Sequence, residues 1–393
     1  MPDERLPFLD KANIPGRLKA LGLSNGLFGP LNALTDIIDA DENLRRLAWY
    51  LHWRVFITPE KNLPWGAPPL LNRLGQQAGL FYLLLSLEFA PRLAEWHRTL
   101  RYPESVTTET LQQIDCFVSN HMRGRGVPGV YERQFPWLAT YFIQPLIRLG
   151  RLEYQLSPFA GGVCVWKRAS DNAVLAVAEE GALFTEEGVL QSPDASASPA
   201  GTTRLVEREN EVIGNPVDPA GFVLAKQVRL PRPAWQPCLR RGDTVLSLHI
   251  PAGGKMDWES VTRSFERAVD FFKRHHPDSP FRALVLKTWF MDPRLGELLP
   301  ENSNPLKMQR AAYCYPTKPD PEGLWFIFFR PIKTTLPANW PADTSLQRSL
   351  IAFMQNGRGW NGGGMFMLPD DMIAPEENRY RRIFQSLRNG WGI

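Results

Sequence analysis

The residue pattern best suited to chemistry is the segment Pro251–Met256, which reads PAGGKM. A strand is predicted before it, over Thr244–Ile250, and a helix after it, from Asp257 to about His276. The first turn of a helix has unbonded N–H groups and a partial positive charge, which suit phosphate. Adjacent glycines admit an anion to those amides, unless they serve packing alone, and a lysine adds charge. The candidate anion-binding residues are Ala252, Gly253, Gly254, Lys255 and Met256.

Three further side chains are candidates for acid–base chemistry. His249 lies one residue before the end of the predicted strand, on its more polar face, where a base beside a bound electrophile would be expected. Tyr313 and Tyr315 are two residues apart on a predicted strand, so they share a face, and a phenol can protonate a leaving thiolate. The alternatives are a hydrogen-bonded structural histidine and buried tyrosines that fill space.

Other chemistries have weaker residue patterns. The four cysteines are scattered, and the six histidines show no metal-ligand spacing with them, so we expect reduced thiols and no metal. Gly357–Gly362 reads GRGWNG, but it follows a predicted helix instead of a strand, which indicates a glycine-rich turn and not a dinucleotide site. The 13 tryptophans leave open a carbohydrate-active enzyme, which would need two carboxylates in one cleft.

Composition and charge limit the class of protein. The 393 residues are 44% hydrophobic and 22% charged, which is typical of a globular chain. The net charge of +4 predicts no nucleic-acid partner. The most apolar run, Gly79–Ala90, is shorter than the roughly 20 residues that a bilayer requires, and the first residues show no secretory signal. We therefore expect a cytoplasmic protein without a membrane span.

Hydrophobic periodicity divides the chain into two predicted domains. Residues 1–150 carry helical spacing, and residues 151–393 begin with short β-type runs and mix strands with helices. Four helices are predicted in the first domain: one after Asp41, one from near Pro68–Pro69 to about Phe89, one after Thr107 or Thr108, and one over Phe135–Leu149 with a kink at Pro145. The fold class is therefore α+β.

The second domain is predicted in three parts: a strand meander over 151–230, a core over 240–335 and helices over 343–393. Ser192–Gly201 is predicted to be a surface loop, and Leu230–Pro237 a stiff connector. The remaining predicted elements are a buried strand over Phe281–Phe290, an antiparallel pair of Leu306–Tyr315 with Leu324–Arg330, a helix from Asp343 or Thr344, and a helical tail from Asp370.

Several strings resemble a bacterial two-domain acyltransferase family, which joins a helical N-acyltransferase N-terminal domain to a GNAT-like C-terminal domain. The strings are AGLFYLLL at 78–85, LIRLGRLEYQL at 146–156, LHIPAGG at 248–254, FRALVLKTWFMDP at 281–293, LLPENSN at 298–304 and DTSLQR at 343–348. Together they span most of the chain. The resemblance implies a GNAT-like mixed sheet, with the strand over Thr244–Ile250 as the fourth GNAT strand.

The resemblance also implies a function and a site. In GNAT-like enzymes, amides between the fourth strand and the third helix hold the coenzyme A pyrophosphate, and the next strand diverges to admit pantetheine. The implied activity is transfer of an acyl group from acyl-CoA, as co-substrate, to a small-molecule amine or a peptide. His249 is then the candidate base, and Tyr313 or Tyr315 the acid that protonates the thiolate. The alternative is a non-catalytic ligand-binding protein on a GNAT-like scaffold.

Overall fold

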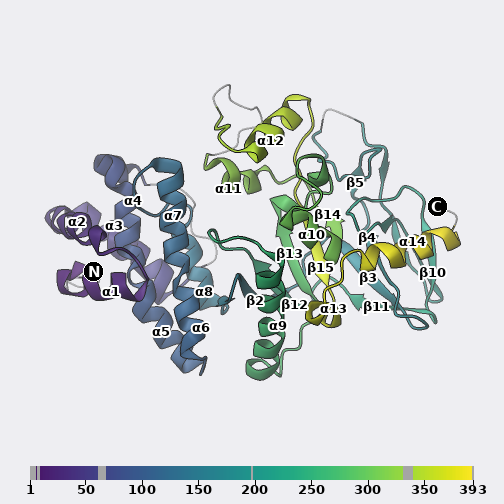
Figure 1. The fold of residues 1–393 in the computed structure, drawn as a ribbon, viewed down its shortest axis with the longest axis horizontal. Coiled ribbons are helices and arrows are strands. Elements are labelled where there is room, and N and C mark those ends of the chain that lie inside the picture. The colour runs from purple at the N-terminus through teal and green to yellow at the C-terminus, as the bar shows by residue number, and fades with distance from the viewer. Residues whose placement is uncertain (1–5, 7–8, 61–67, 196–197, 331–339, 392–393) are drawn as a thin grey trace. The chain divides into compact units, whose positions relative to one another are not determined.

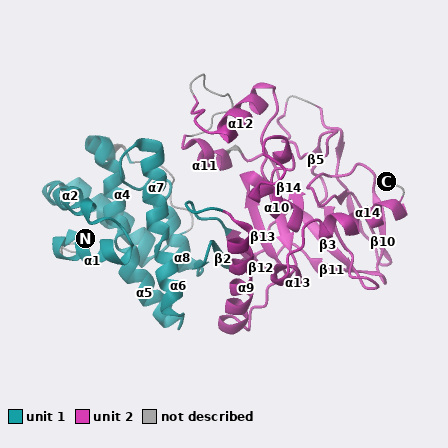
Figure 2. Cartoon of the chain, in the orientation of Figure 1, with its two compact units in different colours: residues 1–155, 249–255 teal, residues 156–248, 256–393 magenta. Residues whose placement is uncertain are grey.

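The computed structural model describes residues 6, 9–60, 68–195, 198–330 and 340–391 (Figure 1). Two residues of the predicted surface loop, 196–197, lie outside this part of the chain. The chain forms two compact units (Figure 2). Unit 1 comprises residues 1–155 and 249–255, and unit 2 comprises residues 156–248 and 256–393. The PAGGKM loop (Pro251–Met256) therefore lies in unit 1 except for its last residue, although the strand before it lies in unit 2 up to Leu248.

Unit 1 is mainly helical, as predicted. Its α-helices are α1 Ile14–Ala20, α2 Phe28–Ala40, α3 Glu42–His52, α4 Ala78–Ser86, α5 Phe89–Thr99, α6 Glu104–Leu111, α7 Gln113–Arg125 and α8 Thr140–Ile143. The predicted cap of α3 is confirmed, because the Asp41 carboxylate accepts hydrogen bonds from the amides of Asn43 and Leu44. The apolar faces of these helices pack into one core around α4, in which Phe81, Leu83 and Leu84 are fully buried.

Two of the helices predicted in this unit end earlier than expected. The segment 68–89 has 3₁₀ geometry over Pro69–Gln77, interrupted by a kink at Gly75 with φ 51°, and then forms α4, which ends at Ser86. Helix α8 ends at Ile143, since Gln144 precedes a proline and is extended. The prediction of a helix through Leu149 is therefore wrong, and residues 147–149 form a strand instead.

A hairpin follows these helices. Its strands are β1 Ile147–Leu149 and β2 Leu152–Pro158, which pair antiparallel with Leu149 opposite Leu152. The turn consists of Gly150, with φ 74°, and Arg151. This two-residue turn requires a positive φ that glycine adopts without steric cost.

The largest sheet has the strand order β1-β2-β12-β13-β15-β14. Its strands beyond β2 are β12 Thr244–His249, β13 Leu284–Thr288, β14 Tyr313–Pro316 and β15 Gly363–Met367. Strands β12 and β13 are parallel, whereas β15 is antiparallel to both β13 and β14. The mixed sheet confirms the predicted fold class.

The helices of unit 2 are α9 Trp258–His275, α10 Asn304–Ala311, α11 Trp325–Phe328, α12 Ser345–Gln355, α13 Pro369–Ile373 and α14 Arg379–Trp391. The helix predicted from Asp343 or Thr344 is confirmed as α12, with a capping box between Thr344 and Gln347. The predicted helical tail is confirmed as α13 and α14.

The predicted antiparallel pair of Leu306–Tyr315 with Leu324–Arg330 is wrong. The first segment is mostly α10, which starts with Pro305 in its first turn, and only its end enters β14. The second segment contains α11, whose continuous apolar sequence does not distinguish a short buried helix from a strand.

The segment predicted as a strand meander contains short strands, which form smaller sheets. These strands are β3 Val163–Arg168, β4 Val174–Ala178, β5 Leu183–Phe184, β6 Gly201–Thr202, β7 Leu205–Glu207, β8 Glu211–Gly214, β9 Pro216–Val217, β10 Val228–Pro231 and β11 Trp235–Leu239. The orders are β11-β3-β4-β9, β10-β8-β7 and β5-β6. The expected connector over Leu230–Pro237 is instead the end of β10, a turn and the start of β11, because both segments pair with neighbouring strands.

Candidate active site

The PAGGKM loop leaves β12 and leads directly into α9. Gly253 and Gly254 both have positive φ, 82° and 67°, which explains why glycines stand at these two positions. Both glycines and Lys255 are exposed. A Cβ added at Gly253 would meet no atom within 4 Å, so this residue faces open space and not a packed neighbour. The alternative that Gly253 serves close packing is therefore not supported by its surroundings.

Side chains of unit 1 bond the carbonyl groups of the loop. Arg151 donates from Nη1 to the Pro251 carbonyl oxygen at 2.9 Å and from Nε to that of Lys255 at 3.3 Å. The thiol of Cys116, on α7, donates to the Ala252 carbonyl oxygen at 2.9 Å. Three of the carbonyls are therefore occupied by two side chains that come from distant parts of the sequence.

The backbone N–H groups of the loop differ from its carbonyl groups, which are bonded by side chains. Within the described part of the chain, no protein acceptor is recorded for the N–H groups of the five candidate anion-binding residues, 252–256. Helix α9 starts with the predicted cap, since Asp257 accepts from the Ser260 amide at 2.9 Å. The Asp257 carboxylate therefore satisfies one of the donors of the helix N-terminus, and the loop amides lie directly before that terminus.

The strand before the loop separates from its parallel neighbour. Strands β12 and β13 pair only at Leu246 with Leu284 and at Ser247 with Val285, whereas β13 continues to pair with β15 as far as Thr288. The two parallel strands thus diverge toward their carboxyl ends. Ligands bind at such ends in open sheets that contain parallel strands.

His249 is the last residue of β12 and is half-buried in unit 1. Its Nε2 lies 2.9 Å from the amide nitrogen of Gln155, and its ring lies edge-on to Trp137 at 5.1 Å between centroids. Burial lowers the pKa of His249 to about 4, so the ring is neutral at pH 7. In this arrangement Gln155 donates to the lone pair that a general base would use. Gln155 and Trp137 were not among the sequence candidates.

Tyr313 and Tyr315 share a face of β14, as predicted, and both are buried in one apolar cluster of unit 2. The Tyr313 hydroxyl donates to the Val217 carbonyl at 2.5 Å and accepts from the Ala176 amide at 3.2 Å. Burial raises the pKa of both phenols well above its usual value. These contacts favour the structural alternative for Tyr313, whereas the ring of Tyr315 contacts Phe159 edge-on.

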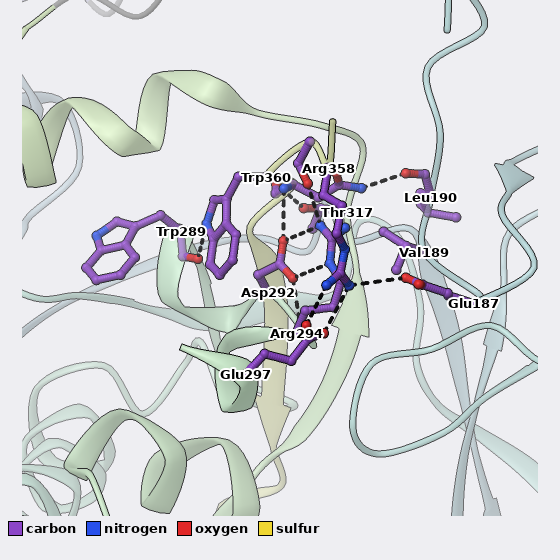
Figure 3. A network of polar contacts seen from close by, with 12 residues as sticks. Glu187, Val189, Leu190, Trp289, Asp292, Arg294, Glu297, Thr317, Arg358 and Trp360 are labelled. Carbon is purple, nitrogen blue, oxygen red and sulfur yellow. Dashed lines mark hydrogen bonds and ion pairs between the residues drawn. The ribbon is translucent and has the colours of Figure 1, made fainter. Parts of the chain in front are cut away.

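The GRGWNG segment is a turn between α12 and β15, as its sequence context predicted, and it closes a buried polar network in unit 2 (Figure 3). Asp292 forms a two-contact ion pair with Arg294, at 2.9 and 2.8 Å. Arg294 also donates to the Gly359 carbonyl, and Asp292 accepts from the Asn361 amide. The Asn361 side chain donates to the Leu190 carbonyl. The segment therefore stabilises the chain that follows β13.

Metal and membrane chemistry receive no support from the described residues. Among them, no group of three or more histidine, cysteine, aspartate or glutamate side chains is arranged to hold a metal ion. No helix in the described part is both long and apolar enough to span a membrane.

Family models match almost the whole chain. Residues 12–143 match the N-acyltransferase N-terminal domain, and residues 146–366 match the GNAT-like C-terminal domain. The second match covers more than half of the chain, so the protein belongs to the GNAT-like C-terminal domain family, here joined to an N-acyltransferase N-terminal domain. No curated protein matches the chain.

Solved structures with the same fold are acyltransferases. A mutant acyltransferase solved with octanoyl-CoA is 22% identical, with a TM-score of 0.61 over 93% of this chain and 91% of that one. Another, solved with decanoyl-CoA and teicoplanin, is 21% identical, with a TM-score of 0.53 over 90% of this chain and 98% of that one. At these identities the likeness establishes the fold.

Proposed function

We propose that the protein is an acyl-CoA-dependent N-acyltransferase, which moves an acyl group from the thioester of acyl-CoA to an amine. The observation that carries the proposal is the direction of the loop amides. In a trans peptide the N–H of one residue points opposite to the C=O of the residue before it. Because the carbonyls of Pro251, Ala252 and Lys255 face Arg151 and Cys116, the amides of Ala252, Gly253 and Met256 point away from these side chains.

Those amides are suited to the diphosphate of coenzyme A. Among the described residues they have no protein acceptor, they precede a helix, and the exposed Lys255 adds a positive charge in the same turn. The divergence of β12 from β13 supports the same ligand, since the thin pantetheine arm requires a gap between strands and can bond to their free backbone groups. Family membership and acyl-CoA complexes of similar fold support this assignment.

The chemistry requires that a neutral amine attack the thioester carbonyl. The tetrahedral intermediate places negative charge on the carbonyl oxygen, which backbone amides near the end of β12 would stabilise, except that Pro251 has no N–H to donate. The intermediate then expels the coenzyme A thiolate, and one proton passes from the amine to solvent or to a base. His249 is neutral at pH 7 and would accept that proton only after Gln155 releases its Nε2.

The acceptor that we propose is a primary amine on a small molecule or a peptide. One structure of similar fold is an acyltransferase in complex with decanoyl-CoA and teicoplanin, and this complex supports an acceptor of either size. The four cysteines are free thiols, which supports a reducing compartment such as the cytoplasm.

Calorimetry and thermal-shift measurements with acetyl-CoA, octanoyl-CoA and decanoyl-CoA test the proposal. Gly253→Asp places a carboxylate among the loop amides, so coenzyme affinity should fall at least tenfold. Gly22→Asp is the matched control, because Gly22 also has a positive φ, 67°, and open space around its Cβ position in unit 1. The proposal would be refuted if the wild-type protein bound none of these three acyl-CoAs.

A non-catalytic binding protein is the second candidate. It is favoured by one observation: the Tyr313 hydroxyl and the His249 lone pair are both engaged by protein groups. Release of free coenzyme A thiol in the presence of octanoyl-CoA and a set of primary amines separates the two candidates. Tight binding of octanoyl-CoA, with no release of coenzyme A thiol whichever amine is added, would support the binding protein.

A further inference from the structure

We propose that Arg151 and Cys116 are positioning residues, which fix the PAGGKM loop in its binding conformation before the coenzyme arrives. The inference rests on the proposed function, and it assigns to unit 1 a part in coenzyme affinity. Neither residue belongs to the loop, and neither was a candidate from the sequence. Their positions in the sequence, 116 and 151, are about 100 residues or more from the loop carbonyls that they bind.

Arg151 holds the loop at both ends. Its guanidinium bonds the Pro251 carbonyl at the start and the Lys255 carbonyl near the end. The rigid, planar fork of an arginine can hold two acceptors at once in a fixed geometry, which a lysine ammonium on a flexible stem does less well. The side chain also lies beside the second glycine, since a Cβ on Gly254 would be 3.7 Å from Nε of Arg151.

The hairpin that carries Arg151 is itself fixed to helix α6. The Gly150 amide donates to the Glu109 carboxylate at 2.6 Å, and the Arg148 amide donates to the Thr110 hydroxyl at 3.0 Å. Arg148 further donates from Nε to the Gly150 carbonyl at 3.1 Å. These bonds connect the turn to the helical core, so Arg151 starts from a defined backbone position.

Cys116 holds the middle of the loop. The thiol is buried, donates to the Ala252 carbonyl, and receives a contact from Nη1 of Arg148 at 3.7 Å. Cys116 and Arg151 therefore reach three carbonyls from one side. The trans geometry of the peptide group then turns the intervening amides to the other side. A loop fixed in this way loses less conformational freedom on binding the diphosphate than a free loop would.

The decisive experiment compares octanoyl-CoA with octanoyl-pantetheine, which lacks the nucleotide and the diphosphate. Arg151→Ala and Cys116→Ala should each weaken octanoyl-CoA binding, about tenfold or more for the arginine, and change octanoyl-pantetheine binding less than twofold. Turnover should show a raised KM with kcat nearly unchanged. Arg46→Ala, on the exposed face of α3, is the matched control and should change neither ligand.

A conservative variant separates positioning from simple charge attraction. Arg151→Lys keeps the positive charge but not the planar fork, so it should restore little of the lost affinity. Full restoration by the lysine, or equal losses for octanoyl-CoA and octanoyl-pantetheine, would overturn the proposal.

Trypsin cleavage after the exposed Lys255 gives a readout that requires no coenzyme. A fixed loop resists the protease, which must bend several residues into its active site. Cleavage after Lys255 should therefore be several-fold faster in Arg151→Ala and Cys116→Ala than in the wild type or Arg46→Ala. Unchanged cleavage would refute the positioning role even if coenzyme A binds. Faster cleavage in a protein that binds no coenzyme would refute only the proposed function.

Discussion

A buried carboxyl group lies beside the residues that hold the PAGGKM loop. Glu153, on β2, is only 1% exposed, accepts a hydrogen bond from the Tyr141 hydroxyl at 2.9 Å and stands opposite Arg148 in the hairpin. Burial raises the pKa of Glu153 to about 7, against the smaller lowering effects of Tyr141 and Arg148. An unfolded glutamate titrates near 4.3, so the folded protein holds this proton more tightly than the unfolded chain.

The raised pKa of Glu153 predicts a loss of stability toward alkaline pH. Its stabilising contribution is complete below the unfolded pKa and disappears as pH rises through 7, since ionisation is then costly only in the folded state. We expect this group to lower the free energy of unfolding by about 2 kcal/mol between pH 5.5 and 7.5. The histidines of unit 1 titrate in the same range, so the test is the difference from the wild type: in urea titrations the free energy of unfolding of Glu153→Gln relative to the wild type should rise by about 2 kcal/mol from pH 5.5 to 7.5, whereas for Glu42→Gln, an exposed control, the difference should stay constant. An unchanged slope in Glu153→Gln would contradict the assignment.

At the scale of secondary structure, strand β15 shows how packing overrides local preference. Glycines are poor strand formers, yet Gly363 and Gly364 lie in a strand bonded on both sides, to β13 and β14. A Cβ on Gly364 would lie 2.2 Å from the Tyr315 ring, and one on Gly363 would lie 2.0 Å from the Met291 carbonyl oxygen. The glycines are required because an aromatic ring and a backbone segment lie directly against the strand.

Gly364→Ala should therefore destabilise the protein by about 2–3 kcal/mol, through overpacking against Tyr315. Combining it with Tyr315→Val should cost less than the sum of the two single changes, with a coupling of about 1 kcal/mol or more. Gly29→Ala is the matched control, since Gly29 lies in helix α2 with open space around it, and it should be neutral or slightly stabilising. Chemical denaturation measures all four variants, and strict additivity would exclude the clash as the cause.

At the scale of the whole molecule, the two units differ in their response to acid. His52, His97 and His249 all belong to unit 1, and burial is the main cause that lowers the pKa of each to about 4. A free histidine titrates near 6.5, so the unfolded chain binds protons that the folded unit does not. The stability that these groups contribute is complete above pH 6.5 and is lost as pH falls toward 4.

We predict that unit 1 opens before unit 2 on acidification. The three histidines together outweigh the opposite effect of Glu153, so the net loss between pH 6.5 and 5 is about 3 kcal/mol. Hydrogen exchange, corrected for intrinsic rates, should show early opening in peptides from 9–60 and 68–155. His97→Asn, whose amide can keep the bond to Thr107, should reduce the loss. Earlier opening of peptides from unit 2 would refute the prediction.

The sequence by itself determined the features that depend on neighbouring residues. The caps of α3, α9 and α12, the strand before the PAGGKM loop and the turn at GRGWNG were all predicted from local spacing. Family membership was also predicted, because the strings that carry it are contiguous. Local patterns failed for Leu324–Arg330, where an unbroken apolar run fits a buried helix as well as a strand.

Only the tertiary structure decided which residues surround the loop. Cys116 lies 136 residues before the carbonyl that it binds, and Gln155 lies 94 residues before His249. A side chain has no sequence pattern that specifies a distant backbone carbonyl as its partner, and the direction of the loop amides depends on those partners. The string that contains Arg151 was recognisable in the sequence, but its contact with the loop follows from how the hairpin is fixed to α6.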